Sequence, residues 1–170
     1  MCGAELTALP EGVQRVARSL QEREHPHAPQ MLSDAARTAQ QAADALGVQL
    51  GQIAKSIIFR RVADDRAVLV VTSGDKRVDV AKVAAQVGGL TRADAAFVKS
   101  STGFTIGGVS PVGHANSSVT LIDRELFRFE SIWAAAGHPH AVFPLQPQDL
   151  VRLTSAPVVD VVEDAAKEGV

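Results

Sequence analysis

Hydrophobic and polar positions alternate along this chain with two periods, one typical of helices and one typical of strands. Apolar residues at helical spacing follow Pro10 and stop at the break at residues 25–27, which predicts an N-terminal helix. Thr38, followed three residues later by a glutamine, predicts a capped helix that ends at Gly47. Asp79 is placed to cap another helix, which a pair of glycines ends.

Extended segments separate these helices. The strands predicted from alternating or continuous apolar runs lie at residues 53–62, 67–72, 118–123, 141–143 and 158–162. The run at 67–72 is apolar on both faces and therefore predicts a central strand. Helices are predicted at 147–153 and, as a short segment, at 91–100, whereas the pattern at 127–136 fits either structure.

The order of these elements predicts one α/β domain, because helices and strands interleave without a linker or an internal repeat. We assign residues 31–163 to this domain. Residues 1–30 form a helical segment that we expect to pack on it, and residues 164–170 are expected to be a frayed tail. A chain of 170 residues, 46% of them hydrophobic, is long enough for one real core and too short for two comfortable domains.

The segment at residues 103–114 holds four glycines and one proline in twelve positions, which excludes a regular helix or strand. It also holds four large apolar residues, Phe104, Ile106, Val109 and Val112, which predict that it is fixed against the core. Glycine lets the main chain approach a ligand without a Cβ atom in the way. Two interpretations remain open: a ligand-binding loop, or a tight turn between core strands.

Lys55 is the most informative charged residue, because it lies inside an apolar strand. An inward-facing lysine is costly unless its ammonium group meets an anion or lines a wet cleft. The pattern equally allows Lys55 to face the solvent side of a half-buried strand.

Two other chemistries can be weighed from the residues. A serine hydrolase built on Ser110 and His114 is rejected, because no G-x-S-x-G motif is present and Pro111 has no N–H to donate to an oxyanion. The two His-x-His pairs lack the further ligands of a zinc site, so no metal is predicted. We interpret the pair at residues 25 and 27 as surface residues, and leave His138 and His140 open between the surface and the border of a cleft.

Charge and composition limit the possible partners. A formal net charge of −2 argues against broad, sequence-blind binding of nucleic acid, and DNA is not expected as a partner. It still allows a few phosphates to be held in one pocket, and the candidates near strand ends are Arg60, Arg61, Lys76 and Arg77. The single cysteine excludes an internal disulfide, and no signal peptide or membrane span is evident, so a cytoplasmic protein without membrane contact is expected.

Several motifs together resemble the YbaK/prolyl-tRNA-synthetase-associated domain family. They are the capped helix at 38–48, Ala-Lys-Ser-Ile-Ile-Phe at 54–59, Asp-Val-Ala-Lys at 79–82, and Gly-Gly-Val-Ser-Pro-Val-Gly at 107–113. The resemblance implies a compact α/β domain built on a mixed, barrel-like β-sheet with surrounding helices. It also implies a deacylase that acts in trans without a cofactor. Such an enzyme removes a small amino acid such as Ala, Cys, Ser or Thr from a mischarged tRNA, with tRNA-Pro as one candidate.

The resemblance implies roles for particular residues as well. Lys55 matches a lysine that the family needs for deacylation, and residues 107–111 match a loop that contacts the aminoacylated 3′ end. The binding residues expected from the match and from the cleft interpretation are Gly107, Gly108, Val109, Ser110, Pro111, Gly113, His138 and His140. Many relatives carry an acidic residue at 137–145, where this chain has none, which leaves the amino acid open. An aminoacyl-tRNA synthetase is a further expected partner, and the alternative function is a non-catalytic binding module of the same fold for an adenylate-like ligand or a protein.

Overall fold

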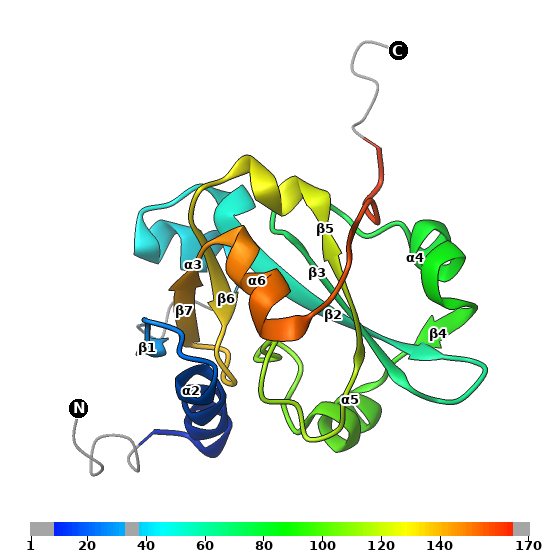
Figure 1. The fold of residues 1–170 in the computed structure, drawn as a ribbon, viewed down its shortest axis with the longest axis horizontal. Helices are drawn as coiled ribbons and strands as arrows, with labels where there is room; N and C mark the ends of the chain where they lie inside the picture. The colour runs from blue at the N-terminus through cyan, green and yellow to red at the C-terminus, as the bar shows by residue number, and fades with distance from the viewer. Residues whose placement is uncertain (1–8, 33–37, 165–170) are drawn as a thin grey trace.

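The computed structural model describes residues 9–32 and 38–164 of the chain. Figure 1 shows the arrangement of its elements, with α4 and α5 at the end that holds β4 and with α2 and α3 toward the opposite end. The helices are α2 (Glu11–Glu22), α3 (Ala39–Leu46), α4 (Val80–Val87), α5 (Ala95–Thr102) and α6 (Pro147–Thr154), with short 3₁₀ turns η1 (Leu50–Gln52) and η2 (Arg124–Arg128). The strands are β1 (Gln30–Met31), β2 (Ile53–Arg61), β3 (Ala67–Ser73), β4 (Leu90–Arg92), β5 (Val119–Asp123), β6 (Ile132–Ala135), β7 (Ala141–Leu145) and β8 (Val158–Val159).

The eight strands of the described residues belong to one mixed sheet, whose main path runs β1-β7-β6-β2-β3-β5-β8. The β2–β3 hairpin at its centre is antiparallel, whereas β6 beside β2 and β5 beside β3 pair in parallel. The short strand β4 lies off this path and pairs with the far end of β2. The predicted α/β domain with a mixed sheet and surrounding helices is thereby confirmed.

Local sequence explains where several elements begin and end. Thr38 and Gln41 form a reciprocal capping box at the start of α3, and Gly47 ends this helix in the left-handed conformation with φ of 70°. The Asp79 side chain accepts hydrogen bonds from the first turn of α4. Every residue of β3 is buried, as a strand that is apolar on both faces requires.

Helix α2 and the glycine-rich segment at 103–114 share one core. Val13, Val16 and Leu20 of α2 are at most 1% exposed and belong to the same buried cluster as Phe104 and Val109 of that segment. The core cluster continues through the sheet to α6. The N-terminal helix is therefore packed against the segment that the sequence singles out.

Three predicted segments differ from the structure. The predicted helix at 91–100 is wrong at its start, because residues 90–92 pair with β2 and Asp94 caps α5 only afterwards. The ambiguous stretch at 127–136 divides into the end of η2 and the strand β6. The strand predicted at 158–162 is shorter, although Val162 still forms an isolated bridge with Val78. Cys2 and residues 165–170 of the expected tail lie outside the described residues.

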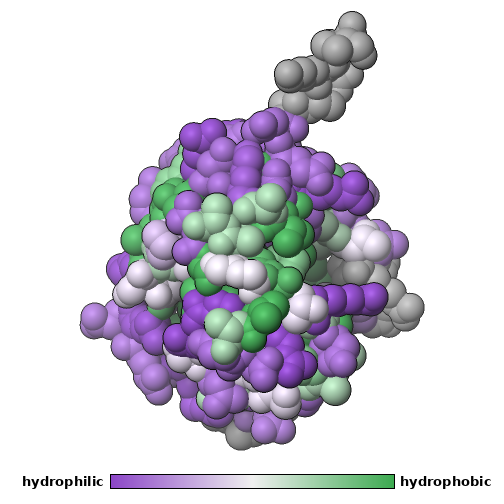
Figure 2. Space-filling view, turned by 90° about the vertical axis from the view of Figure 1, so that its right-hand side faces the viewer, coloured by the Kyte–Doolittle hydropathy of each residue, from purple (hydrophilic) through white to green (hydrophobic). Residues whose placement is uncertain are grey.

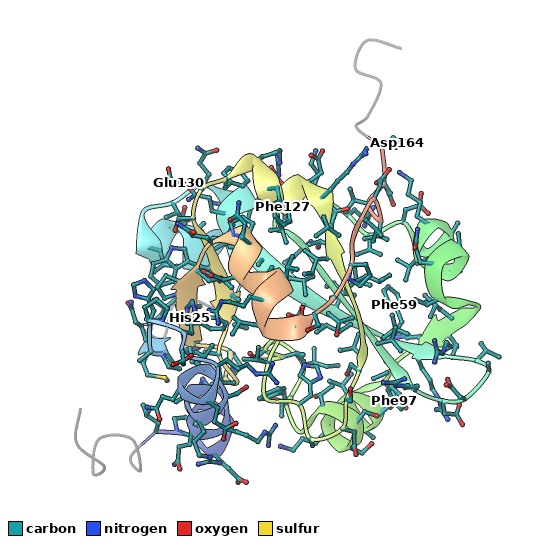
Figure 3. The ribbon with its side chains drawn as sticks, in the orientation of Figure 1. His25, Phe59, Phe97, Phe127, Glu130 and Asp164 are labelled. Carbon is teal, nitrogen blue, oxygen red and sulfur yellow. The ribbon has the colours of Figure 1, made fainter. Side chains whose placement is uncertain are left out.

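The side chains refine two further points. His25 is only 8% exposed, and its Nε2 is 2.9 Å from the carbonyl oxygen of Pro144, so the interpretation of this residue as a surface histidine is wrong. Figure 3 shows His25 between α2 and the neighbouring strands, while Phe59 and Phe97 lie toward the α4–α5 end. At that end, hydrophobic residues are visible in the middle of a largely hydrophilic face (Figure 2). None of the described helices is both long and apolar enough to cross a membrane.

Candidate functional site

A cavity of about 320 Å³ lies between β2, α3, the glycine-rich segment and the β6–β7 turn. Its lining is mostly apolar, and among the described residues Lys55 is the only charged one in it. Strand β2 supplies one wall because consecutive residues of its first half reach the cavity. The lining residues are Thr38, Ala39, Ala42, Ile53, Ala54, Lys55, Ser56, Ile57, Ile106, Gly107, Val109, Trp133, Ala135, Pro139, Ala141 and Val142.

The Lys55 ammonium group donates a hydrogen bond to the carbonyl oxygen of Lys76 at 2.8 Å. No carboxylate of the described residues forms an ion pair with it, although the side chain is half-buried. Burial lowers the pKa of Lys55, the Asp75 carboxylate opposes this, and the Arg77 charge adds to it. One of three ammonium hydrogens is used by the Lys76 carbonyl, so the others remain for an anion or a carbonyl oxygen of a ligand.

The neighbouring charges explain why Lys55 has no acidic partner among the described residues. Burial alone would raise the pKa of Asp75, but hydrogen bonds from Arg128 and Ser73 hold it below its usual value. Arg128 and Asp75 form an ion pair at 2.9 Å, so this carboxylate is already neutralised. Arg77 is exposed, and its charge lies close enough to Lys55 to act on its pKa.

Three of the four cations expected to contact phosphates are bound to carboxylates of this chain. Arg60 pairs with Asp65 at 2.9 Å, and Arg61 pairs with Asp64 at 2.8 Å. Lys76 lies 3.7 Å from a carboxylate oxygen of Glu125. Of these four, Arg77 is the one that forms no ion pair with the described residues.

The glycine-rich segment faces the cavity with only part of its length. Gly107, with φ of 94°, and Val109 line the cavity. Gly108 is buried between them, where a Cβ atom would lie 2.9 Å from the Cα atom of His138. Pro111 and Gly113 instead line a second cavity, on the α2 side of the segment.

Ser110 and His114 hold the segment from inside. The buried Ser110 hydroxyl accepts a hydrogen bond from the N–H of Val112 at 3.1 Å. Because a carbonyl oxygen only accepts, His114 Nε2 donates to the Ser110 carbonyl oxygen at 2.6 Å, and Nδ1 then accepts from the Ser118 hydroxyl at 2.9 Å. Burial lowers the pKa of His114. The Ser110 hydroxyl and His114 are thus not arranged as a nucleophile and its base.

His138 and His140 lie in the turn between β6 and β7, and the backbone of His138 is next to Gly108. The Nδ1 atom of His138 accepts a hydrogen bond from the N–H of His140 at 3.0 Å, and the two rings meet edge to face. Pro139 between them is the residue of this turn that lines the cavity. Within the described parts of the chain, no three His, Cys, Asp or Glu side chains are grouped to hold a metal ion.

Sequence reasoning missed two residues. Ser56 lines the cavity next to Lys55, and its buried hydroxyl has no hydrogen-bond partner among the described residues. Arg15 of α2 donates to the carbonyl oxygens of Gly113 and Thr102, and its guanidinium group lies 4.5 Å from the centre of the Phe104 ring. Ser56 could have been found from the sequence, because it is a polar residue inside the apolar strand that holds Lys55. Arg15 could not, because its hydrogen-bond partners are far away in the sequence.

Comparison with known proteins adds a family match that covers most of the chain. Residues 33–153 match the family model described as aminoacyl-tRNA editing domain. The uncharacterized protein YwhH of Bacillus subtilis is 35% identical over 129 residues, which cover 75% of this chain and 82% of that protein. EbsC of Enterococcus faecalis, named as a candidate Cys-tRNA(Pro)/Cys-tRNA(Cys) deacylase, is 25% identical over 128 residues, which cover 73% of this chain and 76% of that protein. The crystal structure of a candidate trans-editing enzyme for prolyl-tRNA synthetase is 38% identical with a TM-score of 0.86, and the match covers 92% of this chain and 99% of that chain.

Proposed function

Because the chain belongs to the aminoacyl-tRNA editing domain family, we propose that it hydrolyses the ester bond of mischarged tRNA in trans. The observation that carries the proposal is the position of Lys55, a half-buried cation without an acidic partner among the described residues, in the same cavity as Gly107 and Val109. A site that had lost its catalytic function would not be expected to retain a cation that is costly to bury.

The proposed reaction needs a water molecule and the ester alone. Water forms a bond to the carbonyl carbon, the bond between this carbon and the ribose oxygen breaks, and a proton passes to the ribose oxygen. The Lys55 ammonium group donates to the oxygen on which negative charge develops. No Asp, Glu or His of the described residues lines the cavity, so we assign the activation of water to a free hydroxyl of the terminal ribose.

The cavity favours a small, uncharged amino acid. Its walls include Ile53, Trp133 and Val142, and none of its described lining residues offers a carboxylate to a basic side chain. The buried Ser56 hydroxyl, which has no hydrogen-bond partner among the described residues, is the group that we expect to bind the substrate by a hydrogen bond. Alanine, cysteine, serine and threonine fit these conditions, and tRNA-Pro is the first tRNA to test because of the relatives' names.

We further propose that the single-stranded 3′ end of the tRNA is the part that enters the cavity, with Arg77 near its phosphates. A synthetase that releases mischarged tRNA is the partner that would supply this substrate. The reaction places the protein in the cytoplasm, where tRNA is charged.

The direct test is to incubate the protein with tRNA-Pro that has been mischarged with alanine, cysteine, serine or threonine. Release of the amino acid well above the spontaneous rate for at least one ester is expected. Correctly charged prolyl-tRNA is the control that should stay intact. Spontaneous rates throughout, also with tRNAs of other amino acids, would favour a binding module that kept the fold without the reaction.

A further inference from the structure

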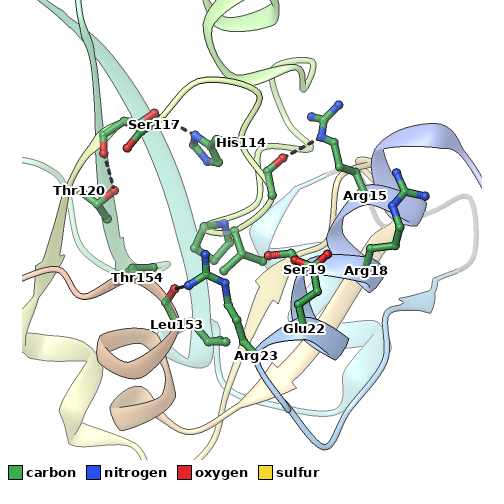
Figure 4. Close-up of a pocket in the computed structure, with 14 residues that line it drawn as sticks. Arg15, Arg18, Ser19, Glu22, Arg23, His114, Ser117, Thr120, Leu153 and Thr154 are labelled. Carbon is green, nitrogen blue, oxygen red and sulfur yellow. Dashed lines mark hydrogen bonds between the residues drawn. The ribbon is translucent and has the colours of Figure 1, made fainter.

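A second cavity of about 420 Å³ lies on the α2 side of the glycine-rich segment. Arg15 and Arg18 of α2 and Arg23, which directly follows this helix, line it, and Figure 4 shows them across from His114 and the residues that lead into β5. The end of α6 closes a further side. Three of its walls therefore come from elements far apart in the sequence.

The charge of this cavity differs from that of the whole protein. Its lining holds three arginines against one glutamate, Glu22, which leaves two positive charges in excess, whereas the chain carries a formal charge of −2. His114 adds no charge near neutral pH, because burial lowers its pKa. Such a concentration of positive charge attracts anions.

Four cations at this cavity also differ from most others in having no carboxylate partner among the described residues. These cations are Arg15, Arg18 and Arg23, which line the cavity, and Arg66 at its margin, which donates to the Ser117 carbonyl oxygen at 3.3 Å. Seven other cations form ion pairs within the described residues, namely Arg60, Arg61, Lys76, Lys82, Arg124, Arg128 and Arg152. Of these, Arg152 lies near the cavity, because it also donates to the Arg23 carbonyl oxygen at 2.6 Å.

Two of the guanidinium groups keep donors for a ligand. Arg18 is exposed and makes no hydrogen bond with the described residues. Arg23 uses one nitrogen, Nη1, on the Leu153 carbonyl oxygen at 2.6 Å, which fixes its planar group and leaves its other donors. Arg15 is committed to the carbonyl oxygens of Gly113 and Thr102 and contributes mainly charge.

We propose that this cavity binds phosphate groups of an RNA backbone, as a second binding site for the acceptor stem of tRNA. Arginine forks match phosphate oxygens in geometry, and such interactions carry no sequence information. The glycine-rich segment joins the two cavities, because Gly107 lines the first and residues 111–114 line the second. The proposal rests on the proposed function in one respect, the identity of the RNA.

The test compares an uncharged acceptor-stem minihelix with a single-stranded oligonucleotide of its 3′ end, by fluorescence titration at several salt concentrations. In the variant Arg18→Gln/Arg23→Gln, the slope of log affinity against log salt for the minihelix should become shallower by roughly 0.9 for each phosphate that the protein no longer neutralises. At 0.1 M salt this corresponds to a roughly eightfold weaker affinity per phosphate. The single-stranded oligonucleotide, which reaches only the first cavity, should bind as before.

Arg92→Gln is the matched control, because Arg92 is an exposed arginine on β4 at the opposite end of the molecule. It should change neither slope. If Arg23→Gln impairs folding, Arg18→Gln alone should still make the slope shallower by the amount expected for one phosphate, since Arg18 has no structural partner in the described residues. Equal slopes for the wild type and both variants would overturn the proposal.

Two further measurements distinguish RNA from a small anion as the source of phosphate, and this binding site from the proposed deacylation. Calorimetric titration with inorganic phosphate that saturates, together with unchanged minihelix binding in the variants, would assign the cavity to a small anion and overturn the RNA assignment. The minihelix carries no amino acid, so its binding does not depend on deacylation. A changed slope without any deacylation would support this binding site and overturn the proposed reaction. Deacylation with unchanged slopes would support the proposed reaction and overturn this binding site.

Discussion

Arg15 Nε donates a hydrogen bond to the carbonyl oxygen of Gly113 at 2.7 Å, although the two residues are 98 positions apart in the chain. The same guanidinium group reaches the carbonyl oxygen of Thr102 at 3.1 Å and stacks against Phe104. One side chain of α2 thus forms hydrogen bonds at both ends of the glycine-rich segment, which carries Gly107 and Gly108. Arg15 lies outside residues 33–153, which match the editing domain.

Replacing Arg15 should therefore loosen the glycine-rich segment. Lysine keeps the charge but cannot serve both carbonyl oxygens with a planar fork. We expect Arg15→Lys to lower the single-turnover deacylation rate by roughly tenfold, because catalytic contacts depend on position, and Arg15→Ala to lower it further. Single-turnover kinetics measure this, with Arg92→Lys as the control that should behave as wild type. A wild-type rate in Arg15→Ala would show that the segment holds its position without α2.

Gly108→Ala should separate the glycine-rich segment from the β6–β7 turn. The added Cβ atom would lie 2.9 Å from backbone atoms of His138, which cannot move aside as a flexible side chain could. Overpacking of this kind costs about 1–3 kcal/mol in the free energy of unfolding. We expect that loss in a urea titration and a fall in kcat/KM of more than tenfold. Gly89→Ala is the control, since the nearest atom to its Cβ, on Val62, is 4.0 Å away; a stable and active Gly108→Ala would refute the close packing.

His114 should make stability depend on pH. Burial holds its pKa below 6.5, hydrogen bonding to Ser110 opposes this, and the Arg15 charge adds to it. The unfolded chain therefore takes up a proton more readily than the folded one, so stability is lost as the pH falls from 6.5 toward the folded pKa. The contribution is at most about 1.4 kcal/mol per pH unit. Urea titrations between pH 7.5 and 5.5 should show a smaller decline in His114→Gln than in the wild type, and equal declines would contradict this assignment.

The deacylation rate should fall on the alkaline side because Lys55 acts as a cation. Burial lowers its pKa from 10.5, so the ammonium form is lost at a lower pH than for an ordinary lysine. After subtraction of the uncatalysed hydrolysis, kcat/KM should decrease as the pH rises through that pKa. Arg77→Ala, which removes the neighbouring positive charge, should move the decrease to higher pH. A decrease that does not move would assign it to another group.

The sequence predicted the helices and strands whose boundaries are set by residues close together in the chain. The capping box of Thr38 and Gln41, the Asp79 cap and the doubly apolar run of β3 each decide a boundary within a few residues. The family resemblance predicted the mixed sheet and the importance of Lys55. The structure adds the cavity that this lysine lines.

Non-local pairing accounts for what could not be predicted from the sequence. Residues 90–92 form a strand only because the end of β2 is free to pair with them. Arg60 and Arg61 looked available for phosphates, but the β2–β3 turn brings Asp64 and Asp65 to them. The arginines of α2 carried no such indication, since charged positions on an amphipathic helix usually face solvent.

The central claim is that Lys55 acts on the ester of mischarged tRNA, and its most direct test is the single-turnover deacylation rate of Lys55→Ala. The substrate is the mischarged tRNA that the wild type hydrolyses best, and Arg92→Ala is the control for the removal of one positive charge. Removing a preorganised charged donor lowers a rate by roughly 10²–10³, so we expect a fall of this size, with a thermal midpoint close to that of the wild type. A Lys55→Ala protein that hydrolyses the ester at nearly the wild-type rate would contradict the account.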